Sequence, residues 1–284
     1  MDIRCENGVV SIVLGEVSDG WRQEIWLFSD VHFDSVYCDR KAYFDHLEQA
    51  VKNKALIIDG GDFFDAMQGR FDPRRSMDEL RPEYRRDDYY DFVVGDAAEK
   101  LAPYADRIVV MGSGNHELSI RKHASTDLTE RLVDRLRQKG APTVRMGYKG
   151  WVRLIVKRAS TGFRTIKIRY SHSGGGGKSA PVTRGVIDSN RQAVFLPDAD
   201  IVWNGHNHQQ WIVIVPRERI TEKGTVYLDY QYHIRTPGYK NDFIADNMGF
   251  AAQLAKGPGV IGCICVELIY KRHGLIINPR LVTP

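Results

Sequence analysis

The sequence lacks both a membrane-spanning stretch and a secretory leader. No apolar run approaches the roughly 18 to 20 residues that a bilayer-spanning helix needs. The first residues, MDIRCENG, carry neither the basic region nor the apolar core of a signal peptide. From these absences we expect neither an integral membrane protein nor secretion through a leader. We therefore expect a cytoplasmic protein that makes no use of a membrane.

Cysteine is also scarce. The 284 residues include four cysteines, and none of them forms a C-x-x-C pair. This excludes a disulfide framework and fits a reducing compartment. Cys263 and Cys265 stand two positions apart in the apolar run VIGCICVELIY. On a strand both side chains would point the same way, so we expect buried thiols.

The surplus of positive charge is small. The chain has 40 lysines and arginines against 36 acidic residues, a net charge of +4. That balance is too small to indicate a protein that binds nucleic acids through its overall positive charge. It does not exclude a local basic groove. With 43% hydrophobic and 27% charged residues the composition is that of a globular protein. The length predicts one large domain over 1–284 with insertions.

Short apolar bursts, alternating with helical patterns, dominate the first half. Bursts rich in Ile and Val indicate strands buried on both faces; they are IWLF (25–28), ALIID (55–59), RIVVM (107–111) and, later, ADIVWN (199–204). Helical patterns lie between the early bursts, at 40–53, 87–104 and 126–140. This alternation predicts an α/β sheet with short connecting loops.

After about residue 150 the pattern changes to strands without intervening helices. Runs such as WVRLIVKR and RTIKIRYSH predict antiparallel or mixed strands. One earlier segment, at about 66–90, lacks apolar periodicity and is rich in arginine, with acids interleaved. We expect it to be an inserted, cap-like surface segment near the second burst.

The predicted strands end in polar clusters rather than in plain turn residues. In open α/β sheets, binding sites form beyond the carboxyl ends of the strands. Loops from neighbouring strands should therefore bring together the Asp, His and Asn side chains of these clusters; they are Asp30, His32, Asp62, Asn115, His172, His206 and His208.

The order of these clusters resembles the calcineurin-like metallophosphoesterase family. The motifs are D-x-H (Asp30, His32), G-D-x-x-D (Gly61 to Asp65), G-N-H-E (Gly114 to Glu117), a lone His172 and G-H-x-H (Gly205 to His208). Together they span about two-thirds of the chain. The resemblance implies an α/β (α+β) fold, a double β-sheet sandwich flanked by helices in four layers, αββα. It also implies two divalent metal ions at the ends of the strands.

The resemblance also assigns the ligands. Asp30, His32 and His208 would hold the first metal, Asn115, His172 and His206 the second, and Asp62 would bridge both. Mixed nitrogen and oxygen donors suit Mn²⁺, which we expect, or Fe, Zn or Ni, whereas Mg or Ca would favour oxygen alone.

The chemistry that the resemblance implies is hydrolysis of a phosphoester by a hydroxide that bridges the two ions. His116 would be the general acid for the leaving alkoxide. Asp65 would hydrogen-bond His116 and keep it protonated, as a carboxylate beside an imidazolium does.

The stretch YSHSGGGGKS (170–179) raises an alternative, a phosphate-binding loop of the form G-x-x-x-x-G-K-[ST]. His172 occupies the position of the first glycine, so the match fails there. Pro181 and Gly185 argue against a helix after the glycines. We interpret the glycines as a backbone that passes close to the metals and substrate, with Lys178 as a candidate phosphate contact.

The motifs narrow the substrate class. GDFFDAM and SGNHE lack the two arginines with which the family's protein serine/threonine phosphatases hold a phosphomonoester. The hypothesis is a phosphodiesterase for DNA, RNA or nucleotides. The alternatives are a phosphomonoesterase for nucleotides or small metabolites and a non-catalytic binding subunit. Arg235, Tyr239 and Lys240 are further candidate substrate contacts, and the sequence predicts no oligomeric state.

Overall fold

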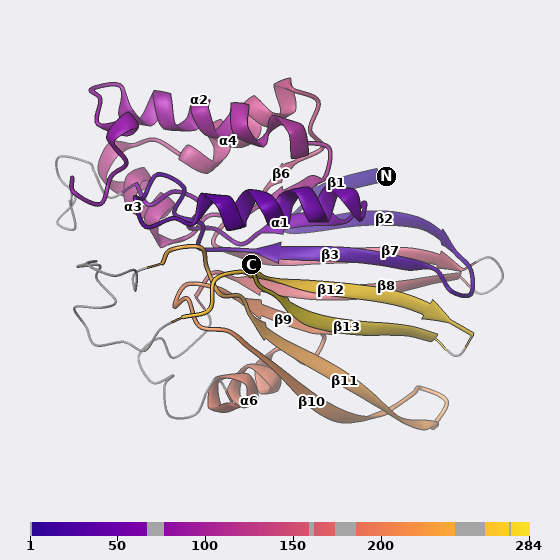
Figure 1. The fold of residues 1–284 in the computed structure, drawn as a ribbon. Helices are drawn as coiled ribbons and strands as arrows, with labels where there is room; N and C mark the ends of the chain where they lie inside the picture. The colour runs from indigo at the N-terminus through magenta and orange to yellow at the C-terminus, as the bar shows by residue number, and fades with distance from the viewer. Residues whose placement is uncertain (1, 67–76, 159–161, 174–185, 242–258, 273) are drawn as a thin grey trace.

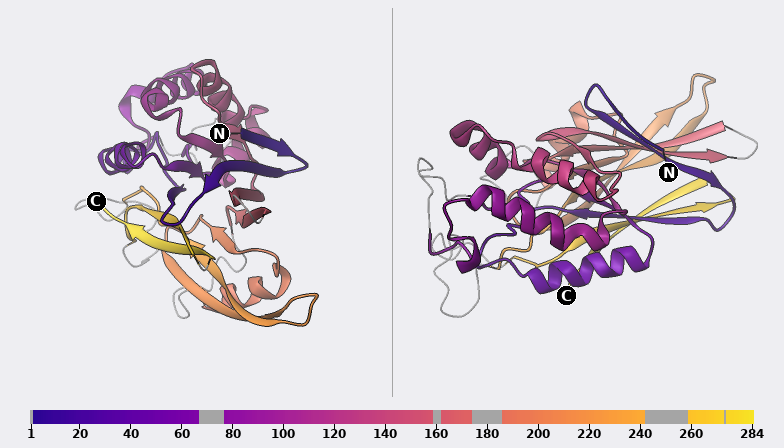
Figure 2. Two further views of the ribbon diagram at one scale, coloured as in Figure 1. Left: turned by 90° about the vertical axis from the view of Figure 1, so that its right-hand side faces the viewer. Right: turned by 90° about the horizontal axis from the view of Figure 1, so that it is seen from above.

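The chain folds into two β-sheets packed face to face, with helices on the outer faces (Figure 1, Figure 2). The computed structural model describes residues 2–66, 77–158, 162–173, 186–241, 259–272 and 274–284. The predicted four-layer sandwich is confirmed. Among the described helices, none is both long and apolar enough to cross a bilayer.

The six-stranded sheet is built around the buried strands that the apolar bursts predict. Its order is β13 (Gly274–Val282), β12 (Cys263–Lys271), β3 (Arg22–Phe28), β4 (Leu56–Asp59), β5 (Ile108–Met111) and β6 (Val144–Arg145). β3 to β6 run parallel, whereas β12 is antiparallel to β3. The loops that follow β3, β4 and β5 therefore leave the sheet at the same edge.

The seven-stranded sheet is mixed. Its order is β1 (Asp2–Glu6), β2 (Val9–Val17), β7 (Lys149–Arg158), β8 (Gly162–Ser171), β9 (Ile201–Asn204), β11 (Val226–Arg235) and β10 (Trp211–Ile220). β8, β9 and β11 are parallel, and their register aligns Ser171, Asn204 and Arg235 at the carboxyl ends. This sheet thus presents a second set of strand ends.

Helices cover the outer face of the six-stranded sheet (Figure 1). They are α1 (Arg40–Lys52), α2 (Tyr89–Leu101) and α4 (Leu128–Gln138), at the predicted positions. The short α3 (Asn115–Ala124) begins a few residues after β5, and the 3₁₀ turns η1 (Pro82–Tyr84) and η2 (Ala102–Tyr104) flank α2. Side-chain caps start α1 and α4, because Asp39 accepts from the Ala42 N–H and Asp127 from the Glu130 N–H, each at 3.0 Å.

Two apolar cores hold the layers together. One, which includes Trp26 and Phe28, lies between the six-stranded sheet and the helices. The other, which includes Tyr170 and Trp203, lies between the sheets. Cys263 and Cys265 are free and buried, as predicted.

The prediction that no helix follows the glycine run was wrong. The helix α6 (Val186–Phe195) begins directly after Gly185, on the far side of the seven-stranded sheet from α1 and α2 (Figure 1). Its buried residues are the polar Asp188, Ser189 and Gln192. Because the apolar side chains face outward, the segment has no apolar stripe that would have marked it as a helix. Residues 174–185, including Lys178, lie outside the described residues.

The described part of the cap-like segment is anchored to the body of the protein. Leu80 and Tyr84 are buried. The Arg81 guanidinium donates to the main-chain carbonyls of Ser35 and Cys38, at 3.0 and 2.9 Å. Most of residues 77–88 are nevertheless exposed, so the expectation of an inserted, cap-like surface segment stays a prediction. Residues 67–76 lie outside the described part of the chain.

Candidate metal centre

The candidate ligands converge at one edge of the sandwich, where strands of both sheets end. The loops after β3 and β4 carry Asp30 and Asp62, and α3, which follows β5, starts at Asn115. From the seven-stranded sheet, His172 follows β8, and His206 and His208 follow β9. Short parallel strands followed at once by polar loops are what position side chains at such an edge.

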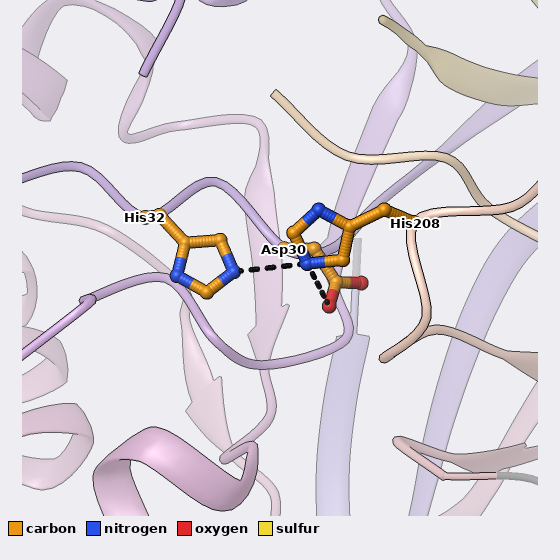
Figure 3. Close-up of side chains that lie close together, drawn as sticks. All are labelled: Asp30, His32 and His208. Atoms are coloured by element: carbon orange, nitrogen blue, oxygen red, sulfur yellow. Dashed lines mark hydrogen bonds and ion pairs between the residues drawn. The ribbon is translucent and has the colours of Figure 1, made fainter. Parts of the chain in front are cut away.

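The first group contains Asp30, His32 and His208, which lie side by side (Figure 3). The Nε2 atoms of the two histidines are 3.2 Å apart, and Nε2 of His208 is 3.6 Å from Asp30 Oδ1. Asp30 and His32 are buried and His208 is partly exposed. Three potential ligand atoms thus face one small volume.

The second group contains Asp62, His172 and His206. Nε2 of His172 is 3.0 Å from Asp62 Oδ2 and 4.0 Å from Asp30 Oδ1, so the two groups adjoin. Asn115 precedes His116, whose main-chain N–H donates to Asp62 Oδ1 at 2.9 Å. All the sequence-predicted ligands therefore lie in one region.

The backbone of the ligand loops is strained. Among the described residues, nine other than glycine have positive φ, and five of these are candidate ligands: Asp30, His32, Asp62, His206 and His208. Such residues rarely adopt the left-handed region, and the outliers concentrate where function imposes them. The concentration here therefore marks a functional site independently of the motifs.

Hydrogen bonds orient the imidazole rings. Nδ1 of His172 donates to the Gly60 carbonyl at 2.9 Å, so its Nε2 faces the second group. Nδ1 of His32 pairs with Asp65 Oδ1 at 2.7 Å, so its Nε2 faces His208. Metal-binding histidines are oriented in this way, by a partner on the nitrogen away from the metal.

The charge states of the two histidines in the first group suit metal ligands. Burial lowers the pKa of His32 to about 4 and that of His208 to about 3, so both rings are neutral at pH 7. His172 differs: burial opposes its charge, but the carboxylates of Asp62 and Asp30 outweigh burial and raise the pKa of His172 to about 10, so the ring must release a proton when it binds a metal ion. Concentrated carboxylate charge of this kind is what a bound cation compensates.

Two predicted ligand atoms of the second ion are buried without a hydrogen-bond partner, and this bears on whether a metal ion fits there. Asn115 Oδ1 and His206 Nδ1 are buried, and neither has a hydrogen-bond partner among the described residues. Buried polar atoms are normally paired, so an orphaned oxygen and an orphaned ring nitrogen in one group require an explanation. A divalent ion provides one, because both are ligand types for Mn, Fe and Zn.

Glu117 is a functional residue that the sequence argument left without a role. Its buried carboxylate accepts from the main-chain N–H groups of Gly114, Asp62 and Phe64, at 2.7, 3.1 and 2.9 Å. Gly114 packs so closely on Asp62 that a Cβ would overlap its carboxylate. Glu117 therefore joins the loop after β4 to the start of α3; its presence in the G-N-H-E motif was the available signal.

The surroundings of His116 differ from the expectation. Its Nδ1 lies 2.5 Å from the main-chain oxygen of Asp65, whereas the Asp65 carboxylate is 3.8 Å away. That carboxylate instead contacts His32 and, at 3.2 Å, the ammonium of Lys240. His116 is thus oriented by a peptide carbonyl. The acid role of His116 stays a prediction.

The candidate substrate contacts beyond the motifs lie deeper than expected. Arg235 is 1% exposed; its guanidinium donates to Asn207 Oδ1 and stacks 4.3 Å from the centre of the Trp211 ring. Tyr239 is a core residue that bonds His46 at 2.7 Å. Arg235 supports the loop that carries His206 and His208, and its contact with substrate stays a prediction.

Comparisons with known proteins agree with the motifs. The model of calcineurin-like phosphoesterases matches residues 24–210. No curated protein sequence matches the chain. Similar solved structures include a conserved, predicted phosphoesterase of Streptococcus pneumoniae TIGR4 (14% identity, TM-score 0.32, covering 93% of this chain and 90% of that one). Another is the vacuolar protein sorting 29 protein of Cryptosporidium parvum (11% identity, TM-score 0.36, covering 93% of this chain and 99% of that one). A third is that of Entamoeba histolytica in complex with Zn²⁺ (10% identity, TM-score 0.31, covering 91% of this chain and 99% of that one).

Proposed function

The chain belongs to the calcineurin-like phosphoesterase family, and from this premise we propose that it is a dinuclear metal-dependent phosphodiesterase acting on nucleic acids or nucleotides. The observation that carries the proposal is the convergence of two adjoining ligand groups, in which His172 Nε2 of one group lies 4.0 Å from Asp30 Oδ1 of the other. Such adjoining groups can place two cations against one phosphate.

The residues divide into two ligand sets. The first ion would bind Asp30, His32 and His208, the second Asn115, His172 and His206, with Asp62 shared. The mixed donors fit Mn²⁺ best in our proposal, with Fe, Zn and Ni as alternatives. Two divalent ions held there would neutralise phosphate charge and lower the pKa of a water molecule so that it attacks at neutral pH.

His116 is the chain's own proton donor in this proposal. Because its Nδ1 is held by the Asp65 carbonyl, its Nε2 faces the ligand groups, 3.8 Å from Asp62 Oδ2. The His116 side chain is 11% exposed, whereas that of Asp62 is 2% exposed. A proton on Nε2 can therefore pass to the oxygen of the departing alcohol, a transfer that contributes typically 10²–10⁴-fold to a rate.

The preference for diesters rests on the cations of the site. A phosphomonoester carries more negative charge than a diester and calls for an extra positive contact. Among the described residues, Lys240 bonds Asp65 and Glu79, and Arg235 bonds Asn207. Both are nearly buried, so neither offers an exposed positive charge to the additional negative charge of a phosphomonoester.

We also propose that the chain works as a single cytoplasmic domain. Both sheets contribute ligands to the centre and share the apolar core between them. Separating the sheets would therefore destroy the centre.

The test is hydrolysis of bis-p-nitrophenyl phosphate and of p-nitrophenyl phosphate by the purified protein with Mn²⁺, with and without a chelator. We expect faster hydrolysis of the diester and its loss in chelator. A faster monoester reaction would replace the diesterase by a phosphomonoesterase. No hydrolysis by a protein shown to hold two ions would favour a non-catalytic binding subunit. If the diester is hydrolysed, DNA, RNA and cyclic nucleotides are the substrates to test next.

A further inference from the structure

A short segment beyond the family match contacts the first ligand group at several points. Residues 236–240 (TPGYK), here called the brace segment, follow β11 and lie outside the matched residues 24–210. No metal-ligand motif falls within them. The structure nevertheless places them against Asp30, His208 and, through Asp65, His32.

Thr236 fixes the carboxylate of Asp30 through a chain of hydroxyls. Trp203 Nε1 lies 3.1 Å from Thr236 Oγ1, which lies 2.6 Å from Ser29 Oγ, and Ser29 Oγ donates to Asp30 Oδ2 at 2.5 Å. The indole only donates and the Ser29 proton goes to Asp30, so the direction is set. Thr236 therefore accepts from Trp203, and its own proton is directed to Ser29 Oγ at 2.6 Å, with the Asn204 carbonyl as a longer second acceptor at 3.3 Å.

The middle of the brace segment packs on Asp30 and His208. The Tyr239 N–H donates to the main-chain oxygen of Asp30 at 2.9 Å. A Cβ at Gly238 would lie 2.8 Å from that oxygen and 3.4 Å from His208 Nδ1, so this close approach requires glycine. The positive φ of Asp30 and His208 is thus held from this side as well.

Lys240 reaches His32 through Asp65. Its buried ammonium lies 3.2 Å from Asp65 Oδ1 and 3.2 Å from Glu79 Oε2. The same Asp65 oxygen is 2.7 Å from His32 Nδ1. A carboxylate held by an ammonium keeps the imidazole proton on Nδ1 and leaves Nε2 as the metal-facing atom.

We propose that the brace segment is a positioning element for the first metal ion, with Thr236 and Lys240 acting through Ser29 and Asp65 on Asp30 and His32. The proposal rests on the two-metal function above. The second group has other supports, the Gly60 carbonyl for His172 and the His116 N–H for Asp62. Loss of a brace contact should therefore weaken the first site and spare the second.

The test is calorimetric titration of metal-free protein with Mn²⁺. The binding step that is lost in His208→Ala is assigned to the first site, and the step lost in Asn115→Ala to the second. Thr236→Val and Lys240→Met should weaken the step that His208→Ala removes by about 10–100-fold, as second-sphere changes do. The other step should stay within about twofold. Thr236→Ser keeps the hydroxyl, and Lys139→Met removes a surface ammonium paired with Glu99; both should match the wild type.

The outcomes separate this proposal from the function on which it rests. A wild type that binds fewer than two ions contradicts the two-metal function itself. A wild type that binds two, with the first step unmoved in both Thr236→Val and Lys240→Met, overturns the brace alone. Equal weakening of both steps also overturns it, because it would show a general loss of structure. Melting of each metal-free variant identifies one that does not fold, and the other variant then decides.

Discussion

The two ligand groups differ in where their support comes from. In the second group the supports lie within the motifs or next to them: the Gly60 carbonyl holds His172, the His116 N–H holds Asp62, and the Glu117 carboxylate holds the loop of Asp62. In the first group, side chains of the brace segment act on Asp30 and His32 through Ser29 and Asp65. The comparison shows that two ligand groups at one metal centre can be oriented by very different parts of the chain.

The difference predicts how well each ligand group tolerates amino-acid substitutions around it. Support from the main chain survives many side-chain substitutions, whereas support from a side chain is lost by one substitution. The second group has such a support in Glu117, inside the motif, and the first has Thr236 and Lys240, outside the motifs. Outside the motifs, the second group is therefore expected to tolerate changes around it better than the first. Substitutions at and around the groups test this, beginning with the residue that both share.

Asp62→Asn should weaken metal binding at both ligand groups, and it has the largest expected effect. Asp62 is assigned to both ions, so both binding steps should weaken in this variant. Loss of the metal contribution, several kcal/mol, corresponds to a fall in diester turnover on the order of 10³-fold or more. Calorimetry and initial rates measure the two effects, with Asp19→Asn, on the surface, as the control. A variant that loses only one step would show that Asp62 serves a single ion.

His116→Ala should separate chemistry from metal binding. We expect both binding steps to stay within about twofold while turnover of a diester with a poor leaving alcohol falls by about 10²–10⁴-fold. A p-nitrophenyl ester, whose leaving group needs less protonation, should lose less. Rates for the two esters measure this. Equal losses for both esters would remove the general-acid role from His116.

Glu117→Gln tests the support of the second group. The carboxylate accepts three main-chain N–H groups, and an amide would turn a donor toward one of them. We expect a loss of about 1–3 kcal/mol in the free energy of unfolding, with the second binding step weakened more than the first. Denaturant unfolding of metal-free protein gives the first quantity, with Glu16→Gln as the exposed control. A variant as stable as the wild type would contradict the role.

His233→Gln should have the smallest effect, because this histidine belongs to neither group. Burial, and then the Arg217 charge, lower its pKa to about 4 from an ordinary value near 6.5. Its Nε2 pairs with Gln231 at 2.9 Å, and its buried Nδ1 has no hydrogen-bond partner in the described part of the chain. The unfolded chain therefore binds the proton first, and stability is lost as pH falls from about 6.5 to about 4.

The measurement is the melting temperature across that pH range, with Mn²⁺ present and absent. His233→Gln should flatten the pH dependence by a few degrees in both conditions. His123→Gln, at an exposed histidine, should keep the slope of the wild type. An unchanged slope in His233→Gln would assign the acid sensitivity to the ligand histidines instead.

The motif residues could be predicted from the sequence because each follows a strand that its apolar run defines. Asp30 comes directly after the end of β3, and Asn115 a few residues after β5. Parallel strands bring such residues to one edge whatever the details of packing. Most helices follow from the same local patterns, whereas the strand order, which places β12 beside β3, was not predicted.

The supports could not be predicted, since they depend on contacts between distant segments. Nothing in TPGYK indicates that Thr236 reaches Ser29, 207 positions earlier, or that Lys240 takes the carboxylate of Asp65. The partner of that carboxylate was expected to be His116, and only the packed arrangement shows His32 in that place. Local patterns place the ligands, whereas tertiary packing orients them.

The central claim is that two ions act together at this centre. The most direct measurement is hydrolysis of bis-p-nitrophenyl phosphate by metal-free protein as Mn²⁺ is added in known equivalents. Our account predicts little activity up to one equivalent, a rise as the second is bound, and a plateau at two per chain. Full activity at one equivalent, or activity that persists without metal, would contradict it.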